Sequence, residues 1–338
     1  MRIAISGASG YIGQHLSSFL EGKGYDVIPL GRDLFKEDCF DELCRCVESC
    51  EVVINLAGAS INKRWTEAYK QELYDSRICV TRQLVHAINT RSVKLELFIS
   101  ASAVGYYPAF GEYDEYHDCR GMDFLARLCG AWEEEASACS SDVRLVITRF
   151  GVVLSEDGGA LKEMLRLQRF SRVSVVIGNG QQRFPWISLF DLCRSFGYII
   201  RNRQMRGVVN LVSPDLITQK QLAHTLARAD KIRRIIPLPE FFFRLKFGEG
   251  ASFVTKGQTV HPSKLQESGF IYIYPTIEKL MNITDHHTVP ELDVKRYMGR
   301  WYEIARYENH FERGMTDVTA TYTLLPDGKI RVENAGYK

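Results

Sequence analysis

Three glycines near the start of the chain restrict its possible folds more than any other feature. Gly7, Gly10 and Gly13 have the spacing GxxGxxG, directly after the apolar run Arg2–Ser6 and at the start of a helical pattern. Gly7 permits a tight turn, Gly10 lets a pyrophosphate approach the backbone, and Gly13 lets the helix pack close to the strand. Free N–H groups at the helix start would then face the phosphates. A plain tight turn is the alternative. The predicted dinucleotide-binding turn comprises Gly7, Gly10, Tyr11, Ile12 and Gly13.

The first 150 residues alternate between strand-like and helical patterns. Short apolar runs are separated by segments whose apolar residues recur every three to four positions. The expected strands are Arg2–Ser6, Val27–Leu30, Val52–Leu56, Leu95–Ser100 and Val143–Phe150, and the expected helices are Tyr11–Lys23, Phe40–Val47, Thr66–Asn89 and Met122–Ala138. This alternation predicts an α/β fold of the Rossmann type, a doubly wound parallel sheet with helices on both faces.

The pattern changes twice further along the chain. After Gly151 the alternation becomes irregular, which favours a small mixed lobe. Beyond a polar segment, apolar and polar residues alternate over Val318–Leu324, and Asp327-Gly328 predicts a hairpin turn. We expect a Rossmann domain over residues 1–150, to which later segments return, a substrate lobe over 151–282, a linker over 283–290 and an antiparallel β meander over 291–338.

Composition excludes several classes of function. Lys and Arg number 43 against 41 Asp and Glu, so we expect no nucleic-acid partner held by bulk charge. No apolar run approaches the roughly 18 residues of a membrane helix, so we expect no membrane span. Nine cysteines without an export signal favour a cytoplasmic protein over a disulfide scaffold. Cys44, Cys46 and Cys50 lack metal-ligand spacing, and His286 and His287 have no further ligands nearby, so we expect no metal site.

The end of the second strand indicates which dinucleotide binds. An acidic residue there accepts the ribose 2′-hydroxyl of NAD, whereas an arginine accommodates the 2′-phosphate of NADP. The strand ends Leu30-Gly31-Arg32-Asp33. Arg32 favours NADP as the cofactor, while Asp33 beside it keeps NAD as the weaker alternative. A solvated surface arginine is the other interpretation of Arg32.

Three segments resemble a known family. Gly7–Gly13, Asn55–Gly58 and Ser100–Tyr107 are similar to the extended short-chain dehydrogenase/reductases, and more narrowly to their atypical branch of epimerase family proteins. The resemblance covers about residues 1–282. It implies a Rossmann fold, NADP and a C-terminal substrate lobe. The further cofactor contacts that it implies are Leu56, Ala57, Gly58 and Ser100.

The chain departs from this family at the catalytic position. Extended reductases use a Tyr-x-x-x-Lys pair for proton transfer, and the corresponding residues here are Asp123 and Arg127. We interpret this pair as an i,i+4 salt bridge. The family's serine or threonine is present as Ser102, whose hydroxyl would polarise a substrate carbonyl. Tyr106 or Tyr107 would replace the missing phenol, and packing of both rings in a loop is the alternative.

Two arginine clusters and one replaced histidine bear on the substrate. The clusters would hold a diphosphate or carboxylate, or form a solvated face. The family's Trp-Ile-His stretch has become Trp186-Ile187-Ser188, which separates this chain from the substrates of its relatives. The clustered residues are Arg166, Arg169 and Arg172, and Arg201, Arg203 and Arg206.

The last segment resembles a different family. Gly299-Arg300-Trp301 and its flanking residues are similar to the start of a bacterial lipocalin. A lipocalin barrel needs about eight strands, and this segment supplies roughly three. The segment is therefore a truncated remnant, or it completes itself against the first domain or against another copy of the chain. The last alternative predicts self-association.

These features lead to three functional hypotheses. The first is an NADP-dependent oxidoreductase or epimerase-like enzyme that acts on a carbonyl or alcohol of a small, sugar-nucleotide-like substrate. The second is a non-catalytic NADP-binding sensor or scaffold, which the missing Tyr/Lys pair favours. The third and weakest is the binding of a lipid or small hydrophobe by the lipocalin-like segment.

We predict that the protein binds NADPH more tightly than NADH, because the Arg32 guanidinium would contact the 2′-phosphate. Titration of the purified protein with each nucleotide measures this difference. Equal or reversed affinities would contradict the assignment of Arg32.

Overall fold

The computed structural model describes residues 1–91, 95–283, 297–302, 316–325 and 330–337. Contacts within the chain divide it into two units, Met1–Thr284 and Asp285–Lys338. The predicted turn at Asp327-Gly328, the histidines His286 and His287, and nearly all of the expected linker lie outside the described residues.

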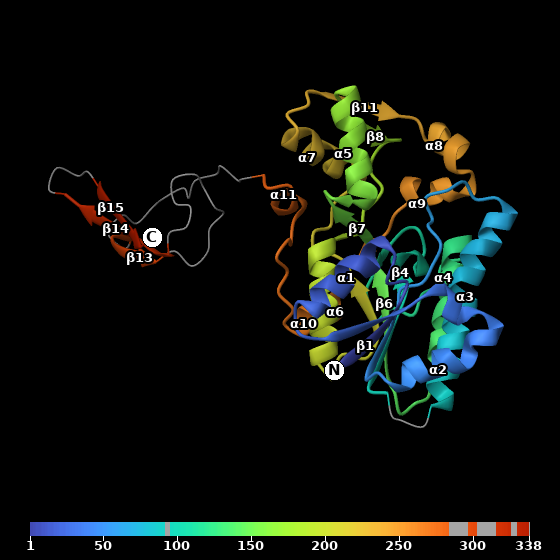
Figure 1. Cartoon of the computed structure of the whole chain (residues 1–338). Helices are drawn as coiled ribbons and strands as arrows, with labels where there is room; N and C mark the ends of the chain where they lie inside the picture. Colours follow the sequence, from blue (N-terminus) through green and yellow to red (C-terminus); the bar gives the residue numbers. More distant parts are fainter. Residues whose placement is uncertain (92–94, 284–296, 303–315, 326–329, 338) are drawn as a thin grey trace. The chain divides into compact units, whose positions relative to one another are not determined.

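A six-stranded parallel sheet forms the centre of the first unit (Figure 1). The sheet has the order β10-β6-β4-β3-β1-β2. Chain order therefore reverses between β1 and β3, and in doubly wound sheets ligands bind at the carboxyl ends of the strands beside such a reversal. The strands are β1 (Arg2–Ser6), β2 (Asp26–Leu30), β3 (Val52–Asn55), β4 (Leu97–Ala103), β6 (Arg144–Phe150) and β10 (Gly207–Leu211).

Alternate residues of the strands supply two separate cores, because successive side chains of a strand point to opposite faces. Ile3 and Ile5 pack with Phe196 on the face covered by α1 (Tyr11–Glu21) and α6 (Leu189–Arg201). Ala4 packs in the second core, which includes residues of α2 (Phe40–Glu48), α3 (Glu67–Thr90) and α4 (Phe124–Ser137). The expected doubly wound α/β fold is therefore confirmed. Short 3-10 helices lie at η1 (Arg32–Phe35), η2 (Glu37–Cys39), η3 (Val104–Tyr106) and η4 (Glu249–Ala251).

Strand β4 continues three residues beyond the predicted end at Ser100. Its pairing with β6 extends to Ala103, which lies opposite Phe150. The sequence Ser100–Ala103 has little strand-forming character, but the neighbouring strand continues to offer backbone partners. Ser102 consequently lies on a rigid strand.

The second half of the first unit forms a lobe and also returns to the sheet. Strands β7 (Val152–Ser155) and β9 (Trp186–Ser188) pair in parallel, as do β8 (Val173–Ile177) and β11 (Arg234–Leu238). Between these segments the chain returns to the main sheet as α6 and β10. The remaining elements are α5 (Gly159–Ser171), α7 (Gln219–Ala229), α8 (Glu240–Phe247), α9 (Ser252–Thr255), α10 (Ser263–Glu267), α11 (Ile277–Leu280) and the pair β5 (Glu112–Tyr113) and β12 (Thr259–Val260).

The second unit contains the expected antiparallel meander. Its strands are β13 (Gly299–Tyr302), β14 (Thr316–Leu324) and β15 (Ile330–Tyr337), and β14 lies between the other two. The Trp301 indole N–H donates to the Tyr297 carbonyl, and the rings of Tyr297 and Tyr322 lie 5.1 Å apart. The indole of Trp301 is about half exposed, at 49%.

In the described part of the chain, none of the helices is long and apolar enough to cross a membrane.

The fully buried carboxylate of Asp191 joins α6 to the end of the first unit. One of its oxygens accepts from the Ile273 amide at 2.9 Å and the other accepts from the Tyr274 amide at 2.8 Å. The guanidinium of Arg194 donates to it at 2.9 Å, and the Ser188 hydroxyl also donates to it at 3.0 Å. Ser188, at the position of the family's histidine, additionally caps the N-terminus of α6.

We predict that Asp191→Ala lowers the free energy of unfolding by about 3 kcal/mol, because it leaves several buried donors unpaired. Urea denaturation measures the change. Glu163→Ala is the matched control, since Glu163 forms an exposed i,i+3 pair with Arg166, and it should leave stability almost unchanged. Similar losses in the two variants would show that the Asp191 contacts contribute little.

Candidate functional site

A cavity of about 570 Å³ opens at the carboxyl edge of the sheet. The glycine turn and the end of β3 line one side of it, and residues of the lobe such as Phe184, Pro185 and Phe253 line the other. Ser102 and Tyr107 also line the cavity. It is therefore at the place where doubly wound sheets bind ligands.

The glycine turn has no room for side chains at two of its positions. Gly7 has a φ of +74°, and a Cβ atom there would lie 2.8 Å from the backbone of Leu56. A Cβ atom on Gly13 would lie 2.2 Å from the Gly7 carbonyl oxygen, so α1 can only approach the turn with glycine at this position. Gly10 precedes α1 and provides no side-chain cap. The amide groups at the start of α1 are thus available to an anion.

The loop after β3 is held by a buried amide. Asn55 accepts from the Ser6 hydroxyl at 2.6 Å and from the Ala57 amide at 3.2 Å. Its own amide group donates to Thr81 at 2.7 Å. These contacts fix Leu56, Ala57 and Gly58, all of which line the cavity.

Arg77 lines the cavity and is not among the residues predicted from the sequence. Its guanidinium donates to the carbonyls of Ala59 at 3.0 Å and Leu73 at 3.1 Å, and it lies 5.3 Å from the Trp132 ring centre. No carboxylate pairs with it in the described part of the chain. Burial lowers the pKa of Arg77. A positive charge without a carboxylate partner therefore lies beside Gly58, in the loop after β3.

Arg32 lies at the start of η1, immediately after β2, and is exposed. It does not line the cavity. The neighbouring Asp33 carboxylate pairs with the Lys36 ammonium group at 2.5 Å, and the hydrogen bond from Lys36 lowers the pKa of Asp33. Asp33 therefore has a cationic partner already, whereas Arg32 has no ion-pair partner within the described ranges.

Ser102 belongs to a buried network with Glu133 and Arg149. The Ser102 hydroxyl donates to one carboxylate oxygen of Glu133 at 2.6 Å. Arg149 donates to both oxygens of Glu133, at 2.8 and 2.7 Å. Burial alone would lower the pKa of Arg149, but the hydrogen bonds and charge of Glu133 outweigh it and raise that pKa. Since Ser102 donates its only hydroxyl hydrogen here, its oxygen is left to accept a hydrogen bond.

The two candidate tyrosines pack around the same arginine. The Arg149 guanidinium lies 3.5 Å from the Tyr106 ring centre and 4.7 Å from that of Tyr107. The Tyr107 hydroxyl donates to the Asp114 carbonyl at 2.8 Å, and the Tyr106 hydroxyl donates to Asp118 at 3.2 Å. Burial raises the pKa of both phenols. Tyr107 lines the cavity, whereas Tyr106 does not.

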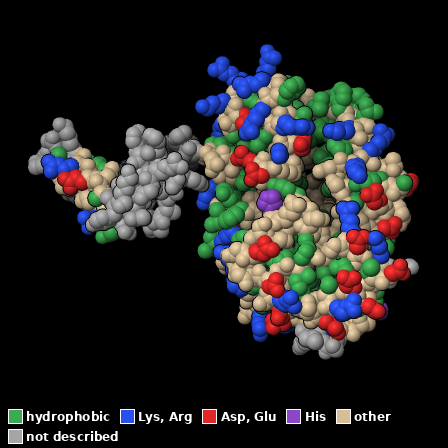
Figure 2. Space-filling view, viewed as in Figure 1, with side chains coloured by type: hydrophobic (Ala, Val, Ile, Leu, Met, Phe, Trp, Pro, Cys, Tyr) green, Lys and Arg blue, Asp and Glu red, His purple; other side chains and the backbone are tan. Residues whose placement is uncertain are grey.

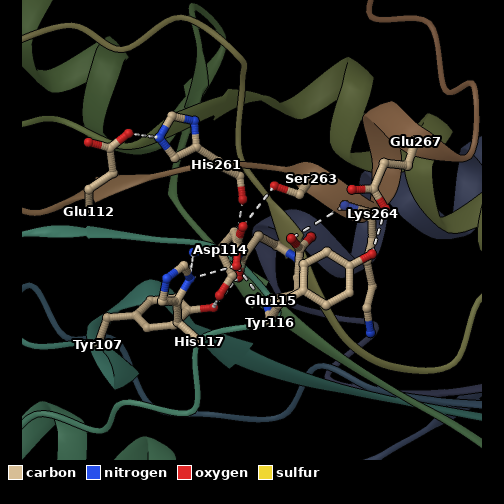
Figure 3. A network of polar contacts seen from close by, with 11 residues as sticks. Tyr107, Glu112, Asp114, Glu115, Tyr116, His117, His261, Ser263, Lys264 and Glu267 are labelled. Atoms are coloured by element: carbon tan, nitrogen blue, oxygen red, sulfur yellow. Dashed lines mark hydrogen bonds and ion pairs between the residues drawn. The ribbon is translucent and has the colours of Figure 1, made fainter.

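A second polar network holds the segment that contacts Tyr107 (Figure 3). His261 pairs with Glu112 at 2.5 Å, and Ser263 donates to Asp114 at 3.3 Å. The Glu115 carboxylate accepts from the amides of Asn210 at 2.9 Å and Lys264 at 3.3 Å, and burial raises its pKa. Residues 112–117 are thereby fastened to β10, β12 and α10.

Several further sequence predictions have different outcomes. The prediction of a salt bridge between Asp123 and Arg127 is wrong. Asp123 instead caps α4 by accepting from the Ala126 amide at 2.9 Å, and the Arg127 guanidinium donates to the Met122 carbonyl at 2.6 Å. Ser100 is buried, does not line the cavity, and its hydroxyl has no partner among the described residues.

The arginine clusters and the cysteines lie outside the cavity, with one exception. Arg166 pairs with Glu163, Arg169 with Asp230, and neither lines the cavity. Within the described residues, no group of three metal-ligating side chains exists. All nine cysteines are free, and Cys129 alone of them lines the cavity.

This fold and this glycine turn define an α/β protein of the doubly wound nucleotide-binding class. The family model described as "NAD dependent epimerase/dehydratase family" matches residues 3–211, so the chain belongs to that family. Residues 238–282 match a domain of unknown function, and residues 292–338 match a lipocalin-like domain.

Similar proteins carry the name epimerase family protein. A chloroplastic protein of Arabidopsis thaliana, a homolog of epimerase family protein SDR39U1, is 33% identical over 82% of this chain and 85% of its own length. YfhF of Bacillus subtilis is 34% identical over 86% of this chain and 100% of its own length. The crystal structure of human SDR39U1 (isoform 2) with NADPH is 32% identical, with a TM-score of 0.76 over 83% of this chain and 98% of that chain.

We predict that Arg149→Leu lowers the free energy of unfolding by about 3 kcal/mol, because it leaves Glu133 as a buried charge without its cation. Thermal or urea denaturation measures the loss. The double variant Arg149→Leu/Glu133→Leu should recover part of it, since no charge is then left unpaired. Arg166→Leu, at an exposed pair, is the control, and an equal loss there would contradict the prediction.

Proposed function

We propose that the protein is an NADP-dependent oxidoreductase or epimerase-like enzyme that acts on a carbonyl or alcohol of a small, sugar-nucleotide-like substrate. The observation that carries the proposal is the cradle at Gly7 and Gly13, where added Cβ atoms would meet backbone. Together with the uncapped start of α1, it suits a pyrophosphate. Membership of the epimerase/dehydratase family and the human relative with NADPH support the same cofactor.

The cofactor would lie along the carboxyl edge of the sheet. Arg32 would contact its 2′-phosphate, since Asp33 already pairs with Lys36. The remaining contacts would come from Gly7, Gly10, Tyr11, Ile12, Gly13, Leu56, Ala57 and Gly58, which all line the cavity, whereas the buried Ser100 does not reach it. Bound nicotinamide would supply hydride chemistry.

Ser102 would orient the substrate's reacting oxygen. While its hydroxyl donates to Glu133, the Ser102 oxygen can only accept a further hydrogen bond, which suits a substrate hydroxyl. To polarise a carbonyl, the Ser102 hydroxyl would have to rotate away from Glu133. Tyr107, or Tyr106 beside it, would serve as the replacement phenol. Their raised pKa values keep both protonated near neutral pH, so each is a donor rather than a base. To donate to a substrate, Tyr107 would have to leave the Asp114 carbonyl, and Tyr106 would have to leave Asp118.

A non-catalytic NADP-binding sensor or scaffold is the second candidate. The positions of the usual Tyr/Lys pair are occupied by Asp123, which caps α4, and by Arg127, which donates to a backbone carbonyl. Neither residue is arranged to transfer a proton, and this arrangement favours a binding role.

The domain boundaries and the setting of the protein also belong to this proposal. We assign the cofactor domain to residues 1–150, to which α6 and β10 return, the substrate lobe to the rest of 151–282, the linker to 283–290 and the lipocalin-like segment to 291–338. A cytoplasmic location accords with the nine free cysteines. For the last segment we propose two weaker alternatives, self-association and binding of a small hydrophobe. The half-exposed indole of Trp301 supports both.

The enzyme and sensor hypotheses make different predictions for the NADPH-loaded protein. As an enzyme, it should oxidise NADPH with at least one member of a panel of aldehydes, ketones and nucleotide-linked ketosugars, followed by NADPH absorbance. Ser102→Ala should slow this turnover by on the order of a hundredfold. NADPH that remains bound but unoxidised with every compound would favour the sensor.

Two glycine variants control this experiment. Gly13→Ala should abolish NADPH binding and turnover, because its Cβ atom would meet the Gly7 carbonyl. Gly31→Ala should retain both, because nothing lies within 4 Å of the Cβ atom it adds. Retention of NADPH by Gly13→Ala would contradict the assigned cofactor site.

A further inference from the structure

The end of the lobe that points away from the main sheet carries large apolar side chains in solvent. We call this surface the lobe tip and define it by α8, the outer face of the β8/β11 pair and the last turn of α5 (Figure 1). Phe170 at the end of α5 is 91% exposed, and Leu245 on α8 is 65% exposed. Figure 2 shows hydrophobic side chains over this end of the lobe, with lysine and arginine side chains beside them.

Helix α8 presents one apolar stripe outward. Phe241, Phe242 and Leu245 share one side of the helix, since residues three and four positions apart are neighbours on a helix surface. All three are exposed, and the rings of Phe241 and Phe242 lie 4.3 Å apart. The Phe247 side chain instead packs toward α9, with its ring 5.6 Å from that of Phe253. The outward stripe is therefore additional to the contacts that hold α8 in place.

The two-stranded sheet beside α8 extends this apolar surface. Val175 of β8 is paired with Ile236 of β11, and both are exposed. Ser174, on the opposite face of β8, is buried, and its hydroxyl donates to the Ala223 carbonyl of α7. One face of this sheet thus packs on the lobe, and the other has no covering element among the described residues.

The segments that form the lobe tip, together with the rest of α5 and with α7 behind the sheet, are strongly basic. Residues 159–175 and 219–248 contain eleven lysines and arginines against three acidic residues, although the whole chain carries a net charge of only +2. Each of the three acidic residues pairs with an arginine of the region: Glu163 with Arg166, Asp230 with Arg169, and Glu240 with Arg244. Eight cations of these segments remain without an ion pair in the described chain, namely Lys162, Arg172, Lys220, Arg228, Lys231, Arg233, Arg234 and Lys246.

We propose that the lobe tip docks on an anionic lipid surface. Phenylalanine and leucine side chains on one face of a helix enter the boundary between headgroups and acyl chains, and lysine and arginine beside them contact acidic headgroups. Long basic side chains can keep their charges in the headgroup layer while their stems cover apolar surface. Charge complementarity therefore identifies the partner as an anionic bilayer.

The same charges argue against a second copy of the chain on this face. A symmetric dimer brings the same patch of both subunits together, so the unpaired arginines and lysines would meet their own equivalents. Phe170 also projects from the end of a helix and does not line a groove. Fluid lipid can surround such a side chain, whereas a folded partner would need a matching pocket.

Vesicle flotation of the full-length protein tests the proposal. Vesicles of phosphatidylcholine alone are compared with vesicles that also contain phosphatidylglycerol, at low and high salt. We expect binding to the anionic vesicles that exceeds binding to neutral ones by about tenfold or more and weakens with salt. Far-UV circular dichroism confirms that each variant is folded.

Two sets of variants separate the apolar and the charged contribution. Phe241→Ser/Phe242→Ser/Leu245→Ser and Arg244→Glu/Lys246→Glu should each reduce binding to anionic vesicles by about tenfold or more. The matched apolar control is Ile271→Ser, a 74% exposed residue outside the lobe tip, which should bind like the wild type.

Several results would overturn the proposal. They are absence of binding to either vesicle, equal binding to both, and unchanged binding in the triple serine variant. Sedimentation velocity tests whether a second copy of the chain occupies the lobe tip instead. A dimer of the wild type that is absent in the triple serine variant would assign the lobe tip to such a copy. An acidic protein that binds while the vesicles do not would assign it to a protein partner.

Discussion

The close approach of helix α1 to the turn after β1 is the constraint on which the site depends. Gly13 lies against the Gly7 carbonyl so tightly that no side chain fits between them. This contact fixes the direction in which α1 leaves the sheet, and so the place where its free amide groups point. The end of β3 is held beside the same turn by Asn55, which ties Ser6 to the start of the next loop. The geometry that we propose for anion binding thus follows from backbone packing, with little contribution from side-chain chemistry.

The substrate side of the cavity is held in place by a buried charge pair, as the glycine turn is held by backbone contacts. Glu133 and Arg149 come from α4 and β6, and Ser102 comes from β4, so their network joins a helix to two neighbouring strands. Such a pair is costly to bury, and it is tolerated because each charge meets hydrogen-bonding partners. The network orients Ser102, while Arg149 also supports the rings of both tyrosines. A single buried arginine therefore organises all three residues that we assign to substrate chemistry.

Local patterns in the sequence were sufficient for the fold and for the glycine turn. Strand and helix periodicity, together with Gly7, Gly10 and Gly13, depends only on near neighbours in the chain. The pairing of Glu133 with Arg149 could not be predicted in this way, because it joins residues brought together by the sheet. Asp123 shows the opposite error: its spacing to Arg127 suits a helix pair, but a residue at the helix start caps backbone amides instead. The role of Asp191 could not be predicted either, because its partners Ile273 and Tyr274 lie far from it in the sequence.

The return of the chain to the main sheet has a consequence for synthesis on the ribosome. The strand β10 and the helix α6 belong to the sheet domain, but they follow most of the first lobe segment in the sequence. A nascent chain that has produced β1 to β6 has an open edge at β6 and an uncovered apolar face where Phe196 will pack. Residues 271–274, which satisfy Asp191, emerge later still. The sheet domain therefore cannot finish folding before the lobe has been synthesised. Until residues 271–274 have been translated, the growing chain exposes an unpaired, aggregation-prone strand edge.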